Sequence, residues 1–161
     1  MNQLHIILLV IAVLGSGLMA GLFSSFSNFI MKSLTKLTPE SGISAMQSIN
    51  IVIVRPAFIL VFFGTGVLSI LALVFGWQEL NNMARLFGSM GSAMYILGGL
   101  GVTMAFNVPL NNRLAVVNAG SKEGEEMWQL YLIKWVFWNH LRSLATILST
   151  LFLVLTVYCA T

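Results

Sequence analysis

Residues 6–31 have the sequence IILLVIAVLGSGLMAGLFSSFSNFIM, in which no side chain is charged. About 20 apolar residues suffice for a helix to cross the hydrocarbon core of a bilayer, so this run predicts a tilted membrane-spanning helix. A cleaved signal peptide is the alternative, but residues 1–5 contain no Lys or Arg and the run is longer than a signal core. The run therefore predicts an integral membrane protein.

Three further stretches lack charged side chains, at residues 56–78, 86–112 and 143–161. Pro56 suits the first turn of a helix, whereas Pro109 is expected to disrupt the third helix or to follow its last turn. The fourth helix is expected to begin within residues 127–131, because no helix breaker intervenes before Arg142. We predict an all-α integral membrane protein, a four-transmembrane-helix bundle that forms a single domain over residues 1–161, with spans at about residues 4–31, 55–77, 86–108 and 135–158.

The composition excludes a soluble domain. Hydrophobic residues make up 58% of the 161 residues and charged residues only 8%, against roughly a quarter charged in soluble proteins. The net charge of +3 comes from single Lys and Arg residues beside apolar segments. Such residues set membrane topology instead of neutralising phosphates, so the lipid bilayer is an expected partner and nucleic acid is not. Cys159 is the only cysteine, so no intrachain disulfide forms, and the sequence leaves open whether the chain is a homo-oligomer.

The basic residues predict the orientation of the chain in the membrane. In a four-span arrangement Arg85 lies on one side, and the other side holds Lys32, Lys36, Arg55, Arg113, Lys122, Lys134 and Arg142. Cytoplasmic loops carry an excess of Lys and Arg, so the two long connections are expected to face the cytoplasm of a plasma or inner membrane. Both termini are then expected on the non-cytoplasmic side.

Polar side chains gather at one end of the predicted bundle. They are Ser27, Asn28, Gln47, Asn50, Arg55, Asn107, Asn111, Asn112, Arg113, Trp138, Asn139, His140 and Arg142. Ionisable and amide groups within or beside a membrane span are costly and therefore indicate function. We expect them to form a polar pocket that caps an apolar cavity, and we expect one hydrogen-bonded cluster of Asn107, Asn112, Arg113, Asn139 and Arg142.

Four motifs carry a resemblance to a known family. They are Phe26-Ser27-Asn28-Phe29 with Met31, Ala45-Met46-Gln47-Ser48-Ile49-Asn50, Thr103 with residues 107–114 (NVPLNNRL), and Trp135 with Trp138-Asn139-His140 and Arg142. In order and spacing the chain resembles the anthrone oxygenase-like membrane proteins, a family also catalogued as a domain of unknown function. Some fungal members of that family are assigned to the oxidation of anthrones to anthraquinones.

The resemblance implies a cofactor-independent oxidation by O2 of a hydrophobic aromatic small molecule. Such a reaction needs a base near neutral pH and donors for a developing phenolate oxygen. On this interpretation the candidate catalytic residues are His140, Arg142 and Arg113. The candidate substrate-binding residues are Asn28, Gln47, Asn50, Arg55, Asn107, Asn112, Trp135, Trp138 and Asn139. No metal site is expected, because no span contains a carboxylate and His5 and His140 lie at opposite ends.

Each of these roles has a structural alternative. At 100° per residue one stripe of the fourth helix holds Tyr131, Trp135, Trp138, Asn139 and Arg142. His140 points about 100° or more away from this stripe, which favours a structural or substrate-orienting role over a catalytic one. Arginines at a span end also extend to lipid phosphates, and asparagines also satisfy backbone groups freed by Pro109.

Two other functions remain open on the sequence. The first is a non-catalytic membrane module that binds a lipid or quinone-like ligand or a partner protein through the same polar end. The second, secondary transport, is disfavoured because carboxylates are absent from the spans and only four spans are present.

Overall fold

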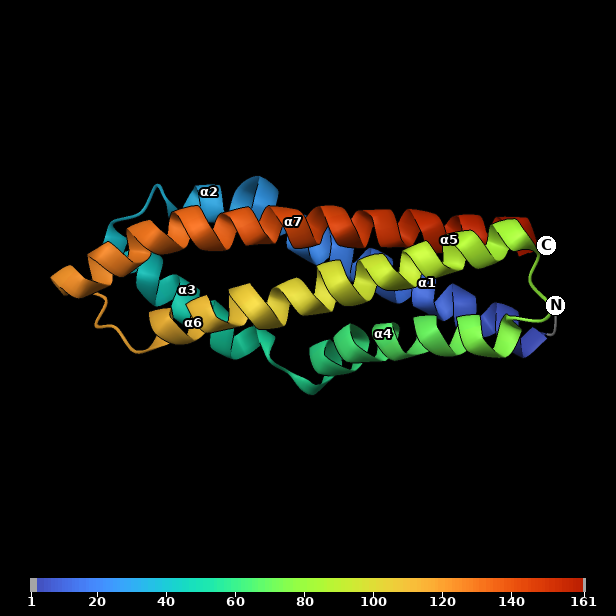
Figure 1. The fold of residues 1–161 in the computed structure, drawn as a ribbon. Helices are drawn as coiled ribbons and strands as arrows, with labels where there is room; N and C mark the ends of the chain where they lie inside the picture. Colours follow the sequence, from blue (N-terminus) through green and yellow to red (C-terminus); the bar gives the residue numbers. More distant parts are fainter. Residues whose placement is uncertain (1–2, 161) are drawn as a thin grey trace.

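The computed structural model describes residues 3–160 and consists of helices in that part of the chain (Figure 1). The elements are α1 (Gln3–Ser25), η1 (Phe26–Ile30), α2 (Met31–Leu34), α3 (Pro39–Ile53), α4 (Pro56–Gly76), α5 (Asn82–Ala93), η2 (Met94–Gly101), η3 (Thr103–Asn107), α6 (Val108–Ala115) and α7 (Lys122–Ala160), where η denotes a π-helical segment. Consecutive elements merge, so that four helices are long and apolar enough to cross a membrane: Gln3–Leu34, Pro56–Gly76, Asn82–Ala115 and Lys122–Ala160. The predicted four-helix, all-α membrane fold is confirmed.

The third helix does not end at Pro109, although the sequence predicts that this proline disrupts the helix or follows its last turn. It continues through Pro109 to Ala115. The π-helical segment η3 ends two residues before this proline, and η2 precedes η3. Proline clashes with the carbonyl four residues earlier and lacks the N–H of the α-helical ladder, and the wider π register relieves both constraints. The helix therefore reaches α3 with its polar side chains in place.

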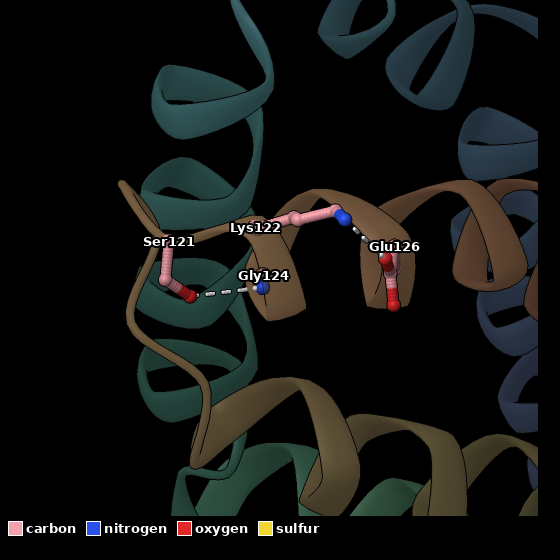
Figure 2. Close-up of polar contacts among 4 residues, drawn as sticks. All are labelled: Ser121, Lys122, Gly124 and Glu126. Carbon is pink, nitrogen blue, oxygen red and sulfur yellow. Dashed lines mark hydrogen bonds and ion pairs between the residues drawn. The ribbon is translucent and has the colours of Figure 1, made fainter.

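The fourth helix begins at Lys122, earlier than residues 127–131 (Figure 2). Ser121 supplies the start signal, because the backbone N–H of Gly124 donates to Ser121 Oγ at 3.0 Å. Glu123 and Glu125 lie in the first turn, where carboxylates favour the positive end of the helix dipole. Lys122 Nζ and Glu126 Oε1 lie 4.0 Å apart on the exposed side of this turn. The helix thus extends well beyond its apolar span and carries Trp128 and Tyr131 into the bundle end.

The two ends of the bundle differ in the segments that they contain (Figure 1). The start of α1, the end of α7 and the short turn between α4 and α5 lie at one end; Met1, Asn2 and Thr161 lie outside the described residues. The short helix α3, the end of α6 and the start of α7 lie at the other end. At that end α3 contacts both α6 and α7. The polar segments predicted to meet are therefore brought to the same end.

The bundle is apolar outside and contains small polar groups inside. Large side chains such as Leu60 and Leu97 are at least 70% exposed, whereas Ser16 and Thr146 are fully buried. Ser16 Oγ donates to the carbonyl of Thr146 at 3.2 Å, which joins α1 to α7. Hydrocarbon supplies little hydrophobic drive for helix association, so such hydrogen bonds and close packing hold the helices together.

Glycines differ sharply in their role at the helix contacts. A Cβ atom on Gly98 would overlap the Cβ of Ala145 on α7, whereas a Cβ on Gly64 would meet nothing within 4 Å. Gly98 therefore sets the approach of η2 to α7, and Gly64 lies on an open face.

We predict that Gly98→Ala destabilises the bundle by about 1 to 3 kcal/mol, because the two helices must separate to admit the methyl group. Gly64→Ala is the matched control and is expected to be neutral or stabilising by up to about 1 kcal/mol, from helix propensity. Unfolding in mixed micelles measures both. Equal stability of the two variants would contradict this account of the contact.

Candidate functional site

The site is organised around Arg142, whose side chain is 7% exposed within the bundle. Its guanidinium carbon lies 4.0 Å from the ring centroid of Phe23 and 5.1 Å from that of Trp135. Aromatic faces attract a cation, and the attraction increases where water is excluded. The charge is thus held between an aromatic ring of α1 and one of α7.

Asn139 orients the guanidinium. Its Oδ1 accepts from Arg142 Nε at 2.9 Å and from Nη2 at 2.8 Å. Its Nδ2 donates to the carbonyl of Phe23 at 3.0 Å and to Ser27 Oγ at 2.7 Å. The amide thereby uses both donors and both acceptor positions, and it ties Arg142 to the end of α1 and to η1.

Thr103 and Ser143 extend the network to the other helices. Thr103 Oγ1 donates to the carbonyl of Gly99 at 2.7 Å, and its oxygen accepts from Arg142 Nη1 at 3.2 Å. Ser143 Oγ donates to the carbonyl of Asn139 at 2.6 Å and lies 3.1 Å from Ser27 Oγ. Because the Ser143 hydroxyl already donates its hydrogen to the carbonyl of Asn139, Ser27 is the donor in its contact with Ser143.

The positive charge of Arg142 has no carboxylate beside it. All five acidic residues are glutamates, and they are exposed in the segments outside the bundle core: Glu40, Glu79, Glu123, Glu125 and Glu126. Three of the five N–H groups of the guanidinium donate to Asn139 and Thr103, which leaves two. A buried charge without a counter-charge costs several kcal/mol, so the site is suited to an anionic or strongly accepting ligand group.

A cavity of about 90 Å³ lies beside Arg142. Its lining includes Phe23, Phe26, Asn50, Phe58, Thr103, Asn111 and Trp135. Two of these residues present buried donors that have no hydrogen-bond partner in the described structure, Asn50 through Nδ2 and Trp135 through Nε1. Buried polar groups are seldom left unpaired. The cavity therefore combines an apolar wall with an excess of hydrogen-bond donors.

A larger surface groove of about 350 Å³ adjoins the cavity between α3 and α6. Asn50, Val54, Val108 and Asn111 line both. Tyr131 Oη donates to Asn111 Oδ1 at 2.7 Å and so holds this shared wall in place.

The groove is braced from α3. Gln47 Nε2 donates to the carbonyls of Leu114 and Val117 at 2.8 and 3.0 Å, which joins α3 to the end of α6. The edges of the groove are therefore tied to each other.

Several predicted site residues meet at these two hollows. Asn50, Trp135 and Arg142 line the cavity; Gln47 and Asn112 line the groove. Asn139 lies behind Arg142, and Asn107 Nδ2 donates to the carbonyl of Trp135 at 3.2 Å.

Other predicted site residues lie elsewhere, and their placement corrects the sequence interpretation. His140 is exposed on the outer side of α7, as expected for a residue 100° from Asn139 on a helix. Asn28 and Arg55 are also exposed. Trp138 stacks on Phe106 with the ring centroids 3.6 Å apart, and it is not among the residues that line the cavity.

The predicted single hydrogen-bonded cluster is wrong. Asn139 and Arg142 form its centre, but Asn107 bonds to a backbone carbonyl, and Asn112 and Arg113 are exposed. Arg113 lines a separate depression with Glu123 and Glu126. The reason is that Arg113 lies at the end of α6, where a long side chain reaches solvent or headgroups without entering the bundle.

Sequence reasoning also missed part of the lining. Phe23, Phe26 and Phe58 belong to apolar runs, in which a cavity-lining ring has the same sequence signal as a lipid-facing one. Asn111 belongs to the polar group at the bundle end and lines the cavity, although it is not among the predicted substrate-binding residues. Its spacing of four from Asn107 is the signal that places both on one helix face.

A comparison with known families identifies the family of this chain. A family model described as anthrone oxygenase matches residues 57–152, which is more than half of the chain. The chain belongs to the anthrone oxygenase family. No curated protein and no solved structure matches the chain.

The part shared with the anthrone oxygenase family contains Thr103, Asn111, Trp135 and Arg142, while Phe23 and Asn50 come from outside the matched residues. Among residues 3–160 no group of three or more His, Cys, Asp or Glu side chains comes together to hold a metal ion.

We predict that Asn139→Leu destabilises the protein by about 3 to 5 kcal/mol, because it leaves the Arg142 charge and a carbonyl of α1 without their partner. The neighbouring change His140→Leu is the control, and it is expected to alter stability by less than about 0.5 kcal/mol, since His140 is exposed. Thermal unfolding in detergent micelles distinguishes the two. Similar losses for both variants would show that Asn139 is not the organising residue.

Proposed function

We propose that this member of the anthrone oxygenase family is a membrane enzyme that oxidises a hydrophobic aromatic substrate with O2, and that Arg142 binds the ionised oxygen of that substrate. The observation that carries the proposal is a buried guanidinium without a carboxylate, beside a cavity with two further unpaired donors. Donors aimed at a developing oxyanion in a water-poor site are among the strongest catalytic devices of proteins.

The chemistry can be written with an anthrone as the substrate. Loss of a proton from the methylene carbon opposite the ketone gives a phenolate, whose oxygen is held by Arg142. One electron passes from this anion to O2, and the resulting superoxide and carbon radical combine into a peroxide anion at the former methylene carbon. This peroxide takes up a proton, which balances the proton lost in the first step, and becomes a hydroperoxide. Loss of water gives the quinone, so one O2 is consumed and one water is formed for each substrate. Every step proceeds without a bound cofactor.

The site supplies stabilisation of the anion more clearly than it supplies a base. Neither histidine nor carboxylate is among the residues that line the cavity. A cation beside a phenolic oxygen favours its ionised form, so the substrate can lose its proton to water. The same observation also supports a second candidate, a non-catalytic module that holds an anionic or quinone-like ligand, and turnover separates the two.

We predict that Arg142→Lys lowers the rate of anthrone oxidation by about 100-fold, because lysine keeps the charge but lacks the fork that Asn139 and Thr103 hold. His140→Gln is expected to stay within about 3-fold of the wild type, since the group required of a base is here exposed on the outer face. Quinone absorbance is followed with and without O2 on monodisperse protein. Equal rates with and without protein would remove the oxygenase proposal, and a large loss in His140→Gln would restore His140 as the base.

We also propose that the termini lie on the non-cytoplasmic side of a plasma or inner membrane, from the excess of lysine at the opposite end. The chain allows a simple test, because Cys159 is its only cysteine. In a Cys159→Ser background, Asn82→Cys is expected to react with an impermeant thiol reagent on intact cells, whereas Val116→Cys is expected to react only after permeabilisation. Both sites are exposed, and the reverse pattern would overturn the orientation.

A further inference from the structure

The cavity and the groove differ in the size of ligand that each accepts. Ligand sites usually have volumes of roughly 300 to 1,000 Å³. The cavity at Arg142 has about 90 Å³, and the groove between α3 and α6 has about 350 Å³. A ring system of several fused rings therefore exceeds the cavity but suits the groove. The cavity suits a single oxygen-bearing edge of such a ligand.

The groove opens on an apolar part of the surface. Ile51 lines it and is 77% exposed, and Val54, in the wall shared with the cavity, is 58% exposed. These residues directly precede Pro56, where the membrane-spanning α4 begins. Large exposed apolar side chains at a span end are stable in the acyl and headgroup region of a bilayer and costly in water. The exposed apolar side chains thus favour a position of the groove mouth at the membrane surface.

The wall between the groove and the cavity contains two asparagines, Asn50 and Asn111. Val54 and Val108 complete this wall, and Tyr131 Oη donates to Asn111 Oδ1 at 2.7 Å. Tyr131 itself is fixed between Trp128 and Trp135, with ring centroids 5.7 and 5.4 Å away. Asn111 is therefore the movable partner. The unpaired Asn50 Nδ2 in the same wall is a donor for an oxygen that passes it.

We propose that the α3–α6 groove is the ring-binding and entry site for the ligand, a flat apolar aromatic molecule with a ketone or phenol oxygen that comes from the bilayer. The rings lie in the groove, the ligand displaces Asn111 from Tyr131, and its oxygen passes Asn50 to reach Arg142. This inference rests on the proposed function for its ligand class, and it adds the route and the place where the rings bind.

The test uses anthrone as the probe and the full chain in lipid vesicles, with binding followed after rapid mixing with anthrone-loaded vesicles. Ala115→Trp and Ile51→Trp fill the groove from its two sides without touching the cavity lining. Both are expected to slow association by about 10-fold or more. Val154→Trp is the matched control, because Val154 is also exposed and lines an apolar groove between α1 and α7. It is expected to associate like the wild type. Tyr131→Phe keeps the ring stack but frees Asn111, so association is expected to become several-fold faster.

The outcomes separate this inference from the proposed function. Wild-type association in both groove variants would overturn the entry site, whatever the enzymatic activity. Normal association without oxygen-dependent quinone formation would overturn only the oxygenase proposal. If anthrone does not bind the wild type, both fail. Finally, when lipid is increased at constant total anthrone, a rate that follows the mole fraction in the lipid supports entry from the bilayer, and a rate that follows the aqueous concentration overturns it.

Discussion

The constraint on which the site depends is the guanidinium of Arg142, which is only 7% exposed inside the bundle. A charge in such a place must be satisfied by neighbouring groups, because the membrane offers none. Asn139 and Thr103 accept its hydrogen bonds, and Phe23 and Trp135 offer it their rings. Each partner belongs to a helix whose position is thereby restricted. The polar network consequently acts as a connection among three of the four long helices as well as a candidate binding site.

The membrane explains why this network is built on helices and why small groups line their contacts. Backbone N–H and C=O groups in hydrocarbon must be paired within the chain, and a helix pairs them within a single segment. Where proline interrupts that pairing, at Pro109, the preceding π-helical turns keep the third helix continuous. They also carry Thr103 and Asn107, both buried at the site. An irregular helix thus places polar side chains where a regular α-helix would turn them to other faces.

Several N–H donors beside the cavity have no hydrogen-bond partner, and this excess determines which class of ligand the site can bind. Arg142 keeps two unused N–H groups, and the Asn50 amide and Trp135 indole add two unpaired donors. A ligand with acceptor oxygens on a flat apolar body complements this arrangement, whether it is then oxidised or only held. In the proposed complex the small cavity binds the oxygen of the ligand, and the larger groove beside it binds the rings.

Hydropathy and charge along the chain were sufficient to predict the four membrane helices and the end at which the polar residues gather. These properties are local, because bilayer thickness selects the length of each apolar run. The motif around Trp135 and Arg142 likewise led to the family. Rotation of each helix about its axis was decided by packing among helices. It turned Asn139 inward and its neighbour His140 outward, left Arg113 exposed, and brought Phe23 to Arg142 across more than a hundred residues. An apolar run does not reveal which of its rings will meet a charge, because hydrocarbon and protein interior are equally apolar, and only the contacts between helices distinguish them.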